Sequence, residues 1–486
     1  MTPLLAVLIP FIGAALIGAA SSRPRLRDGL CFALPIPLFL TVVGVLVHRL
    51  GAEQAIEQVL VELVPGLDIT LTAQPLGLVF ALLASTLYMA ATPYALGYLK
   101  AGGDQHQARF MACYAIALGA TMGIAFAENL LTLYLFYEIL SISTYPLVAH
   151  TGTEKARGGA RTYLALLLGT SVGLMLPAMI WIWYATGTLS FTGGGIMAGA
   201  VPPTAGAIVL VVLIYGIGKA AIMPFHRWLP AAMVAPTPVS ALLHAVAVVK
   251  AGVFSVLTVV LYIFGLDYAH TLVTQPVMLY VAVFTMIAAS LVALRQDNLK
   301  ARLAYSTVSQ LAYIVTGALL ATELSAIGGG LHMLMHGFGK ITLFFCAGAI
   351  YVANGINTVS GMDGLARRMP LTMLAFFIGA LCVIGLPPTG GFWSKWYLIS
   401  GAWNTEYYLV VAAFVVSTLL NIGYLMPPVT RAFLRPLPDA DRVRPQVNEA
   451  PPLCLIPLLM TAAGTLVLFI LADPAYRLLS MGIPGW

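Results

Sequence analysis

Hydrophobic residues gather along this chain in long runs that are separated by short polar segments. A helix needs about 20 apolar residues to cross the hydrocarbon core of a bilayer, and fourteen runs approach that length. The predicted spans are 2–20, 30–48, 75–98, 110–127, 129–149, 163–185, 207–229, 238–263, 275–294, 302–321, 327–352, 371–400, 408–431 and 453–472. The pattern therefore predicts an all-α integral membrane protein with about fourteen transmembrane helices, and a single polytopic membrane domain over residues 1–486.

The distribution of basic residues supports this number of spans. With fourteen spans, eighteen of the 24 lysines and arginines lie on the side of the first loop, and only Arg49 and Arg477 lie on the other side. The remaining four lie inside spans. Because basic loops stay in the cytoplasm, both termini are predicted on the outer side, and segment 50–73 is predicted as an external loop with short strands. The first run has no basic residue before it and no Ala-x-Ala pattern, so we read it as a retained span and not a signal peptide.

Composition excludes the common soluble classes. Hydrophobic residues make up 60% of the chain and charged residues only 9%, with a mean hydropathy of +0.94. Soluble domains carry about 25% charged residues. Five scattered cysteines do not form a disulfide framework or a metal spacing. The net charge of +6 reflects the basic loops, and nucleic-acid binding is not expected.

Five charged residues lie within the apolar spans and are the first functional candidates: Glu138, Lys219, Lys250, Lys340 and Lys395. A charge at the centre of a membrane helix costs about 2.5–3.5 kcal/mol on insertion scales, so such residues face protein or water and are usually functional. For Glu138 the alternative is a structural ion pair that locks two helices together.

Two of the lysines stand beside predicted helix breaks. Lys219 is followed by Pro224, and Lys395 is preceded by Pro387 and a neighbouring proline and glycines. Proline removes a helical hydrogen bond, and interrupted helices in transporters line binding sites or ion pathways. The helix of Lys219 is predicted to break just past the lysine.

The two similar breaks suggest two related structural units. We predict one unit over residues 110–263 and a second over residues 275–431, followed by a C-terminal transmembrane helix at 453–472.

Histidines add a possible relay. His332, His336 and Lys340 are spaced by four and share one helix face, and His244 lies one to two turns before Lys250. Histidine titrates near neutrality and suits proton transfer, although a satisfied structural histidine is the alternative for His332 and His336. Together the six groups Glu138, Lys219, Lys250, His336, Lys340 and Lys395 predict a chain of titratable groups across the membrane. No cofactor or metal site is expected.

Three stretches carry a resemblance to a known family: LYLFYEILSISTYPLVAH, YGIGKAAIMPFHRWLPAAMVAPTPVSALLHAVAVVKAGVF and LAYSTVSQLAYI. They resemble the antiporter-like membrane subunits shared by respiratory complex I, multisubunit Mrp cation/proton antiporters and membrane-bound hydrogenases. The resemblance covers roughly residues 70–430. It implies fourteen helices with two inverted five-helix repeats, each with a broken helix. The family usually has an aspartate where the third span opens, and this chain has Gln74.

The resemblance also implies roles. Glu138 and Lys219 match the carboxylate and lysine pair of the first repeat, Lys250 matches the central lysine, and Lys395 matches the second broken helix, with His336 between them. It implies a proton-translocating subunit that is not itself an enzyme. The pattern favours the D-type subunit of an Mrp antiporter for Na⁺ or K⁺, in a bacterial inner membrane, with other membrane subunits as partners, including a longer antiporter-like homologue. The alternative is a proton-pumping subunit of a complex I-like NADH–quinone oxidoreductase or a membrane-bound hydrogenase.

Overall fold

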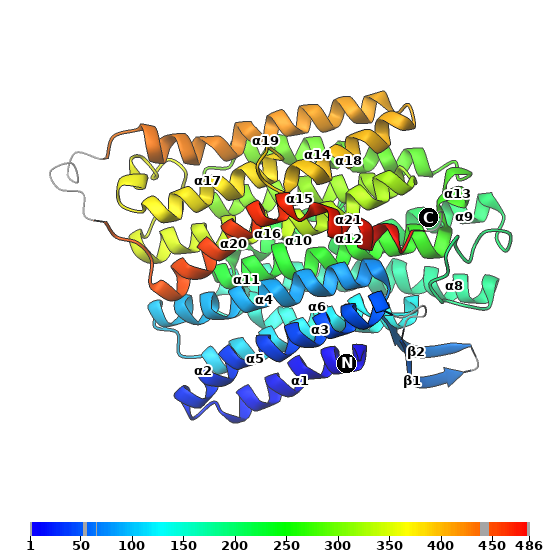
Figure 1. Cartoon of the computed structure of the whole chain (residues 1–486), viewed down its shortest axis with the longest axis horizontal. Coiled ribbons are helices and arrows are strands. Elements are labelled where there is room, and N and C mark those ends of the chain that lie inside the picture. Colours follow the sequence, from blue (N-terminus) through cyan, green and yellow to red (C-terminus); the bar gives the residue numbers. More distant parts are fainter. Residues whose placement is uncertain (1, 52–55, 65, 438–446, 484–486) are drawn as a thin grey trace.

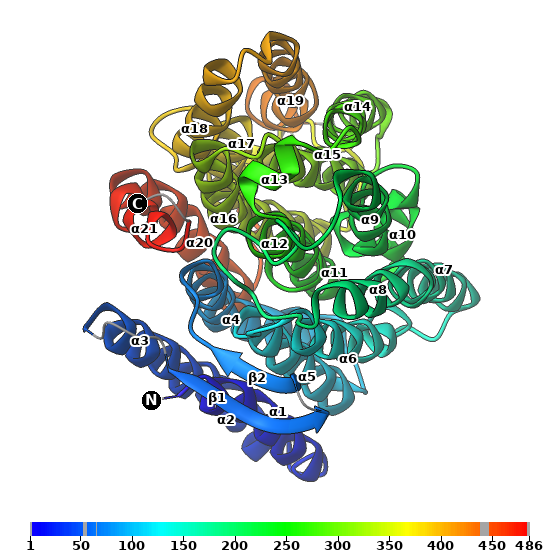
Figure 2. The ribbon, with the colours of Figure 1, turned by 90° about the vertical axis from the view of Figure 1, so that its right-hand side faces the viewer.

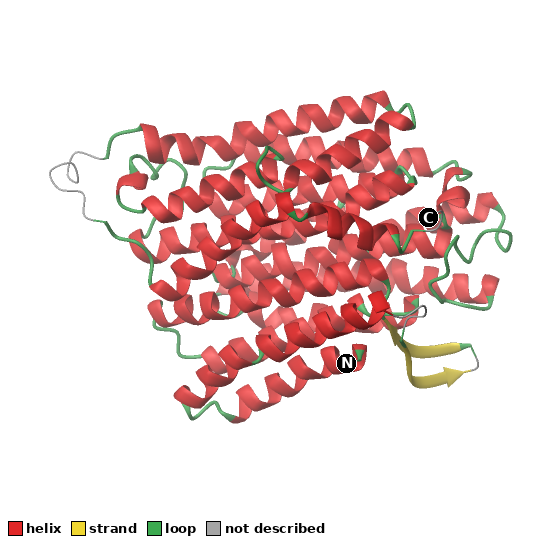
Figure 3. Cartoon of the chain, viewed as in Figure 1, coloured by secondary structure: helices red, strands yellow, loops and turns green. Residues whose placement is uncertain are grey.

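The chain folds into a bundle of long helices that run roughly side by side, with a small β-hairpin at one end (Figure 1). A computed structural model describes residues 2–51, 56–64, 66–437 and 447–483. Residues 52–55 of the predicted external loop lie outside the described part. Figure 3 shows that the secondary structure is almost entirely helical.

The first part of the chain supplies one side of the bundle. Its helices are α1 (Pro3–Ala19), α2 (Pro24–Ala33), α3 (Pro35–Gly51), α4 (Pro75–Ala101), α5 (Gln107–Ala125), α6 (Leu130–Val148), α7 (Glu154–Thr170), α8 (Leu176–Thr186) and α9 (Pro203–Gly216). A π-helical turn, η1 (Ser171–Met175), joins α7 to α8.

A more irregular segment follows α9 and then gives way to a buried helix. It consists of η2 (Gly218–Ala220), η3 (Phe225–Arg227), α10 (Trp228–Ala231), η4 (Ala232–Val234), α11 (Thr237–Ala241), η5 (Leu242–Val246), α12 (Val248–Thr258), η6 (Val259–Phe264) and α13 (Leu266–His270). The continuous run from Thr237 to Phe264 is buried all along its most apolar window. It therefore forms the centre of the bundle.

The remaining helices pack around this centre. They are α14 (Gln275–Arg295), α15 (Leu299–Leu319), α16 (Glu323–Asn354), η7 (Leu365–Arg367), α17 (Pro370–Ile384), α18 (Gly391–Asn404), α19 (Tyr408–Leu434), α20 (Pro452–Ile470) and α21 (Ala472–Ser480). In the end-on view of Figure 2, α16 lies beside α12, and α16 is itself almost fully buried. The two most buried helices thus lie side by side, and they carry Lys250, His332, His336 and Lys340.

Ten helices in the described residues are long and apolar enough to cross a membrane, and α1, α9 and α17 are shorter apolar helices. The chain is therefore a multi-pass, all-α membrane protein, as the hydropathy pattern predicts. Helix ends follow local chemistry. Asn129 accepts a hydrogen bond from the Thr132 amide at the start of α6 (2.8 Å), and Thr322 and Ser325 form a capping box at the start of α16. Helix α5 ends at Ala125 and α6 starts at Leu130, so a tight turn that contains Glu128 and Asn129 joins the two helices.

The predicted strands of the 50–73 segment are present. Strands β1 (Glu57–Val64) and β2 (Leu67–Thr72) form an antiparallel hairpin. Glu128 joins the hairpin to the bundle, because its amide donates to Thr70 O (3.1 Å) and its carbonyl accepts from Phe191 (3.0 Å). Burial raises the pKa of the Glu128 carboxyl to about 7; a hydrogen bond from Asn129 opposes the rise, and the negative charges of nearby acidic side chains on the hairpin add to it.

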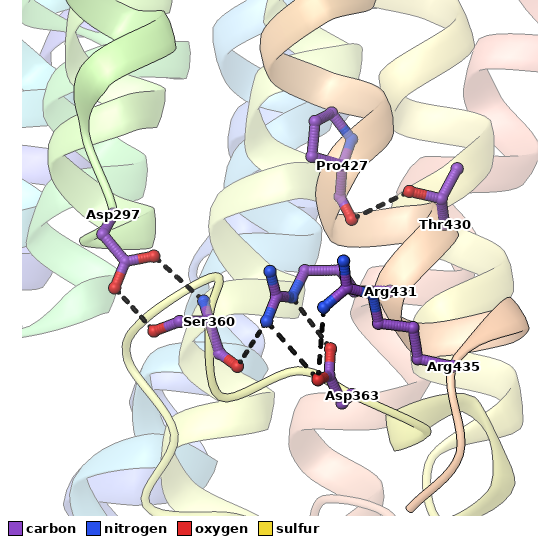
Figure 4. A network of polar contacts seen from close by, with 7 residues as sticks. All are labelled: Asp297, Ser360, Asp363, Pro427, Thr430, Arg431 and Arg435. Atoms are coloured by element: carbon purple, nitrogen blue, oxygen red, sulfur yellow. Dashed lines mark hydrogen bonds and ion pairs between the residues drawn. The ribbon is translucent and has the colours of Figure 1, made fainter.

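At the opposite end, a polar cluster ties two loops to the end of α19 (Figure 4). We call Asp297, Ser360, Asp363 and Arg431 the loop clamp. Ser360 donates through its amide and its hydroxyl to the Asp297 carboxylate (2.9 and 2.6 Å), and these bonds lower the pKa of Asp297. Arg431 donates to Asp363 Oδ1 (2.8 Å) and to Ser360 O (3.1 Å). The clamp therefore fixes the end of α19 to the loops before α15 and before α17.

Candidate functional site

Lys219 lies in a helix break, as the sequence predicts, but the break begins earlier than predicted. Helix α9 ends at Gly216, and Lys219 lies in the single 3₁₀ turn η2. The predicted single span 207–229 is therefore wrong beyond Gly216. The physical cause is close packing: a Cβ on Gly216 would lie 2.5 Å from Met175 N, and one on Gly218 would lie 2.2 Å from Thr170 Oγ1. The chain leaves helical geometry where these glycines press against the neighbouring helix, upstream of Pro224.

The ammonium of Lys219 is fully buried and is held by α6. Its Nζ donates to Tyr137 O (2.8 Å) and to Ser141 Oγ (2.6 Å), and it lies 3.1 Å from the centroid of the Tyr137 ring. The Lys219 amide also donates to Tyr137 Oη (3.0 Å). A buried cation requires such partners, because an unpaired charge in a low-dielectric interior is strongly unfavourable.

Glu138 lies between the two α6 residues that hold Lys219. Its charge interacts electrostatically with the Lys219 ammonium. Neither carboxylate oxygen has a hydrogen-bond partner among the described residues, although both atoms are buried. The carboxylate and the ammonium are thus neighbours, α6 holds only the ammonium, and no direct hydrogen bond joins the two.

Helix α12 carries Lys250 and packs directly against this break. A Cβ on Gly252 would lie 2.3 Å from Lys219 C and 2.4 Å from Ala220 N, so only glycine allows α12 to approach the backbone of the break. The Lys250 ammonium points the other way, to His336 on α16, with Nζ and Nδ1 only 2.5 Å apart. Lys250 therefore connects the first break to the histidine helix.

The histidines of α16 continue the polar line. The His336 and His332 rings stack with centroids 5.9 Å apart. His332 contacts Ser394 Oγ on α18 through Nδ1 (2.9 Å) and Gln310 Oε1 on α15 through Nε2 (3.1 Å). The spacing of four residues predicts that these histidines share one helix face, and the structure confirms this. The shared face points into the protein.

Lys395 closes the line at the second break. Helix α17 ends at Ile384 and α18 begins at Gly391, so the predicted interruption of the 371–400 span is present, with Pro387 inside it. Lys395 Nζ donates to Ile384 O (2.9 Å), which is one of the carbonyls left free by the break, and to Thr418 Oγ1 on α19 (3.3 Å).

Asn421 on α19 joins Lys395 to the rest of the line. In the amide orientation that satisfies its neighbours, Oδ1 accepts from Lys395 Nζ and from Gln310 Nε2, both at 3.0 Å. Its Nδ2 donates to Tyr424 Oη (2.6 Å). Hydrogen bonds thus run from Lys395 through Asn421 and Gln310 to His332.

Lys340 forms a side branch. Its Nζ donates to Ser306 Oγ (2.5 Å) and to Leu303 O (3.3 Å), and Ser306 Oγ contacts Tyr424 Oη (2.9 Å). Because Tyr424 also contacts Asn421, the branch reaches the same junction as Lys395. The structure therefore brings four of the six candidate groups, Lys250, His336, Lys340 and Lys395, to one buried path. The other two, Lys219 and Glu138, form a neighbouring pair at the first break.

His244 is buried, and neither ring nitrogen has a hydrogen-bond partner among the described residues. The charges of Lys340, Lys300 and Lys250 act electrostatically on its imidazole ring. Seven residues before it, Thr237 lines a cavity of about 530 Å³ that also reaches Lys300. That cavity ends about 10 Å from His244 along the helix axis, at 1.5 Å per residue.

Five neutral polar residues were not predicted: Ser306, Gln310, Ser394, Asn421 and Tyr424. Two of them, Ser306 and Gln310, lie within the LAYSTVSQLAYI stretch. Uncharged polar residues are common in membrane helices, so they give a much weaker signal than an intramembrane charge. Their roles depend on which helices meet, which the sequence does not state.

Chemically, the site is a row of amines, imidazoles, hydroxyls and amides in a protein interior. Such groups can accept and donate protons in turn, and histidine can take a proton on one nitrogen while it releases one from the other. The described residues contain no group of three or more His, Cys, Asp or Glu side chains placed to hold a metal ion.

Comparison with known proteins agrees with this architecture. Residues 127–421 match the family model described as NADH:quinone oxidoreductase/Mrp antiporter, transmembrane. The chain belongs to this family. It is 34% identical over 420 residues to the N subunit of the NADH-quinone oxidoreductase of Desulforudis audaxviator, covering 83% of this chain and 82% of that protein.

Other relatives are similar over much of the chain, and a solved structure has the same fold. The chain is 27% identical to the D subunit of the Na(+)/H(+) antiporter of Alkalihalophilus pseudofirmus, with 98% of this chain and 94% of the relative covered. It covers only 45% of NAD(P)H-quinone oxidoreductase chain 5 of Synechocystis, at 32% identity over 62% of this chain. The fold matches a chain of the Mrp complex from Dietzia with a TM-score of 0.87 at 22% identity, covering 99% of this chain and 97% of that chain.

Proposed function

We propose that this chain is a proton-translocating, antiporter-like subunit of a multisubunit membrane complex in a bacterial inner membrane. The observation that carries the proposal is the buried polar line from Lys250 through His336, His332 and Asn421 to Lys395. Each buried polar group costs free energy when it is unpaired, so a row of such groups in a membrane protein usually has a function.

The proposed path begins at the Glu138–Lys219 pair. No direct hydrogen bond holds the two charges together, so a change of protonation on either one alters the field at the other. Gly252 contacts the break, and Lys250 lies two residues before it on the same helix. Lys250 passes the change in the electrostatic field to His336. Lys395 then exchanges protons with one side of the membrane.

The broken helices suit this role. Each places a lysine beside backbone groups that no helix satisfies, and such interruptions line ion sites in transporters. We propose that units 110–263 and 275–431 are the two inverted repeats of the family. The distribution of basic loops supports an orientation with both termini outside.

We favour Mrp-type antiport of Na⁺ or K⁺ against protons, with this chain as the D-type subunit and a longer antiporter-like homologue among its partners. This assignment is supported by the similarity to the D subunit of an antiporter, which extends over nearly the whole of both chains. The second candidate is a pump subunit of a complex I-like oxidoreductase, supported by the 34% identity to an N subunit.

Two measurements test the proposal. The tagged chain is purified in mild detergent with its partners, which are identified by mass; small hydrophobic subunits without flavin or iron–sulfur proteins support antiport, and redox proteins support the second candidate. Proton movement is then followed in vesicles that contain the whole complex, driven by added Na⁺ or K⁺ or by electron transfer.

Variants make the second measurement specific. Glu138→Gln and Lys219→Ala are expected to lower the rate of proton movement by about 10² or more, the usual scale for loss of an acid–base group. Lys155→Ala, at an exposed lysine of α7, is the matched control and is expected to leave the rate unchanged. Wild-type rates in both test variants, with the complex intact, would refute the proposed path.

A further inference from the structure

An apolar groove on the side of the bundle is separate from the polar line. It has a volume of about 540 Å³ and lies between α3, α4, α16, α20 and α21. Figure 2 shows α3 and α21 on the same side of the bundle, and α4 contacts both of them. Among its described lining residues, only Thr86 and Arg477 carry polar side chains.

The groove runs from an open rim to a buried floor. Leu50 and Leu471 at the rim are 57% and 52% exposed, whereas Leu83 and Leu334 at the floor are 1% and 8% exposed. Its walls belong to a protein that spans the membrane, so the rim meets lipid. An apolar hollow of this kind favours an apolar ligand, because its wall offers almost no hydrogen-bonding group.

A single hydrocarbon chain is a narrow apolar group and suits these walls. A helix of a partner subunit is the alternative occupant, and the experiment below distinguishes the two.

Basic residues near the groove indicate the charge of the ligand's head group. Arg49 and Arg477 are the two basic residues that the span assignment places on the hairpin side of the membrane, and both belong to helices that line this groove. Arg477 lines it, and Arg49 lies between Leu46 and Leu50, which line it. Arg477 pairs with Asp473 (2.8 Å) at an exposed position, where ion pairs contribute little and exchange readily.

We infer that this groove binds an anionic phospholipid of the leaflet on the hairpin side. One acyl chain lies in the groove, and the phosphate lies beside Arg477 and Arg49. The acyl chain packs against Leu334 and Phe338, which lie on the face of α16 opposite His332, His336 and Lys340. The lipid therefore packs against the face of α16 that points away from the histidines.

Photo-crosslinking in vesicles tests this inference. Phe338 at the groove, or Val415 on the exposed face of α19 as a control, is replaced with p-benzoylphenylalanine in the complete complex. The complex is placed in vesicles of equal phosphatidylglycerol and phosphatidylcholine, illuminated, and the adduct masses are measured. We expect phospholipid adducts at Phe338, with phosphatidylglycerol enriched about fivefold over its share at Val415, the scale of one basic residue beside an anionic headgroup.

Two further variants separate the chain from the headgroup. Leu82→Trp fills the groove and is expected to abolish the adduct at position 338. Arg477→Gln with Arg49→Gln is expected to keep the adduct and to reduce the enrichment to the value at the control site. A polypeptide adduct at Phe338, no adduct there, or an unchanged enrichment in the arginine variants would overturn the inference. Transport rates do not enter these readouts, so the inference and the proposed function fail separately.

Discussion

The contact between Gly252 and the first helix break makes a sharp prediction about coupling. Changing Gly252 to alanine places a Cβ 2.3 Å from Lys219 C, and ordinary contact begins at 3.4 Å, so α12 and the break must separate by about 1.1 Å. Both partners are backbone, so no side chain can move aside. Overpacking of this kind costs about 1–3 kcal/mol of folding free energy. A misplacement of about 1 Å between reacting groups can lower a rate by about 10².

The assay compares Gly252→Ala with Gly169→Ala in the purified complex. A Cβ at Gly169 meets no atom within 4 Å, so this control tests the same substitution in a helix without the close contact. The control is expected to transport at the wild-type rate and to be slightly more stable, because alanine favours helix by about 0.5–1 kcal/mol over glycine. Gly252→Ala is expected to lose about 10² in initial rate of proton uptake. If it assembles and keeps more than half the wild-type rate, close contact between Lys250 and the break is not required.

Three further predictions follow from the polar line and the hairpin. Lys250→Met removes the amine beside His336 and is expected to lower proton uptake in vesicles by at least about 10²; an unchanged rate would place the path elsewhere. Asn421→Leu leaves the groups that contact it unpaired and is expected to destabilise the protein by about 1–3 kcal/mol, seen as a lower midpoint of thermal unfolding in detergent; an equal midpoint would show that these hydrogen bonds do not stabilise the fold. Because the raised pKa of Glu128 makes the folded chain hold its proton more tightly than the unfolded chain, stability falls as the pH rises from about 4.5 through about 7. Glu128→Gln is expected to reduce the difference between the midpoints at pH 5 and pH 8, and an unchanged difference would refute this assignment.

The helical architecture could be predicted from the sequence because a membrane leaves few structural choices. A backbone in hydrocarbon must satisfy its own hydrogen bonds, so each long apolar run becomes a helix. The lysines were visible for the same reason, since a charge in such a run is exceptional. The hairpin at β1 and β2 followed from the polar segment between the second and third spans.

Other features depended on which helices meet. The position of the first break was predicted from Pro224, but α9 ends at Gly216, where glycine packs against Met175 on a separate helix. Nothing local to the sequence states that contact. Likewise, Gln310 and Asn421 look like ordinary polar residues until the packing of α15 and α19 places Asn421 beside Lys395 and Gln310 beside Asn421. Tertiary packing, and not local preference, decides these parts of the site.

The loop clamp has a mechanical consequence for the second half of the site. Arg431 fixes the end of α19, and Asn421 lies ten residues away on the same helix, about 15 Å along its axis at 1.5 Å per residue. With the clamp as pivot, a tilt of α19 by only about 4° moves Asn421 by about 1 Å relative to Lys395, enough to turn a hydrogen bond of 3.0 Å into no bond. The ion pair of Arg431 with Asp363 thus limits the tilt of α19 and helps to hold Asn421 at the junction of the polar line.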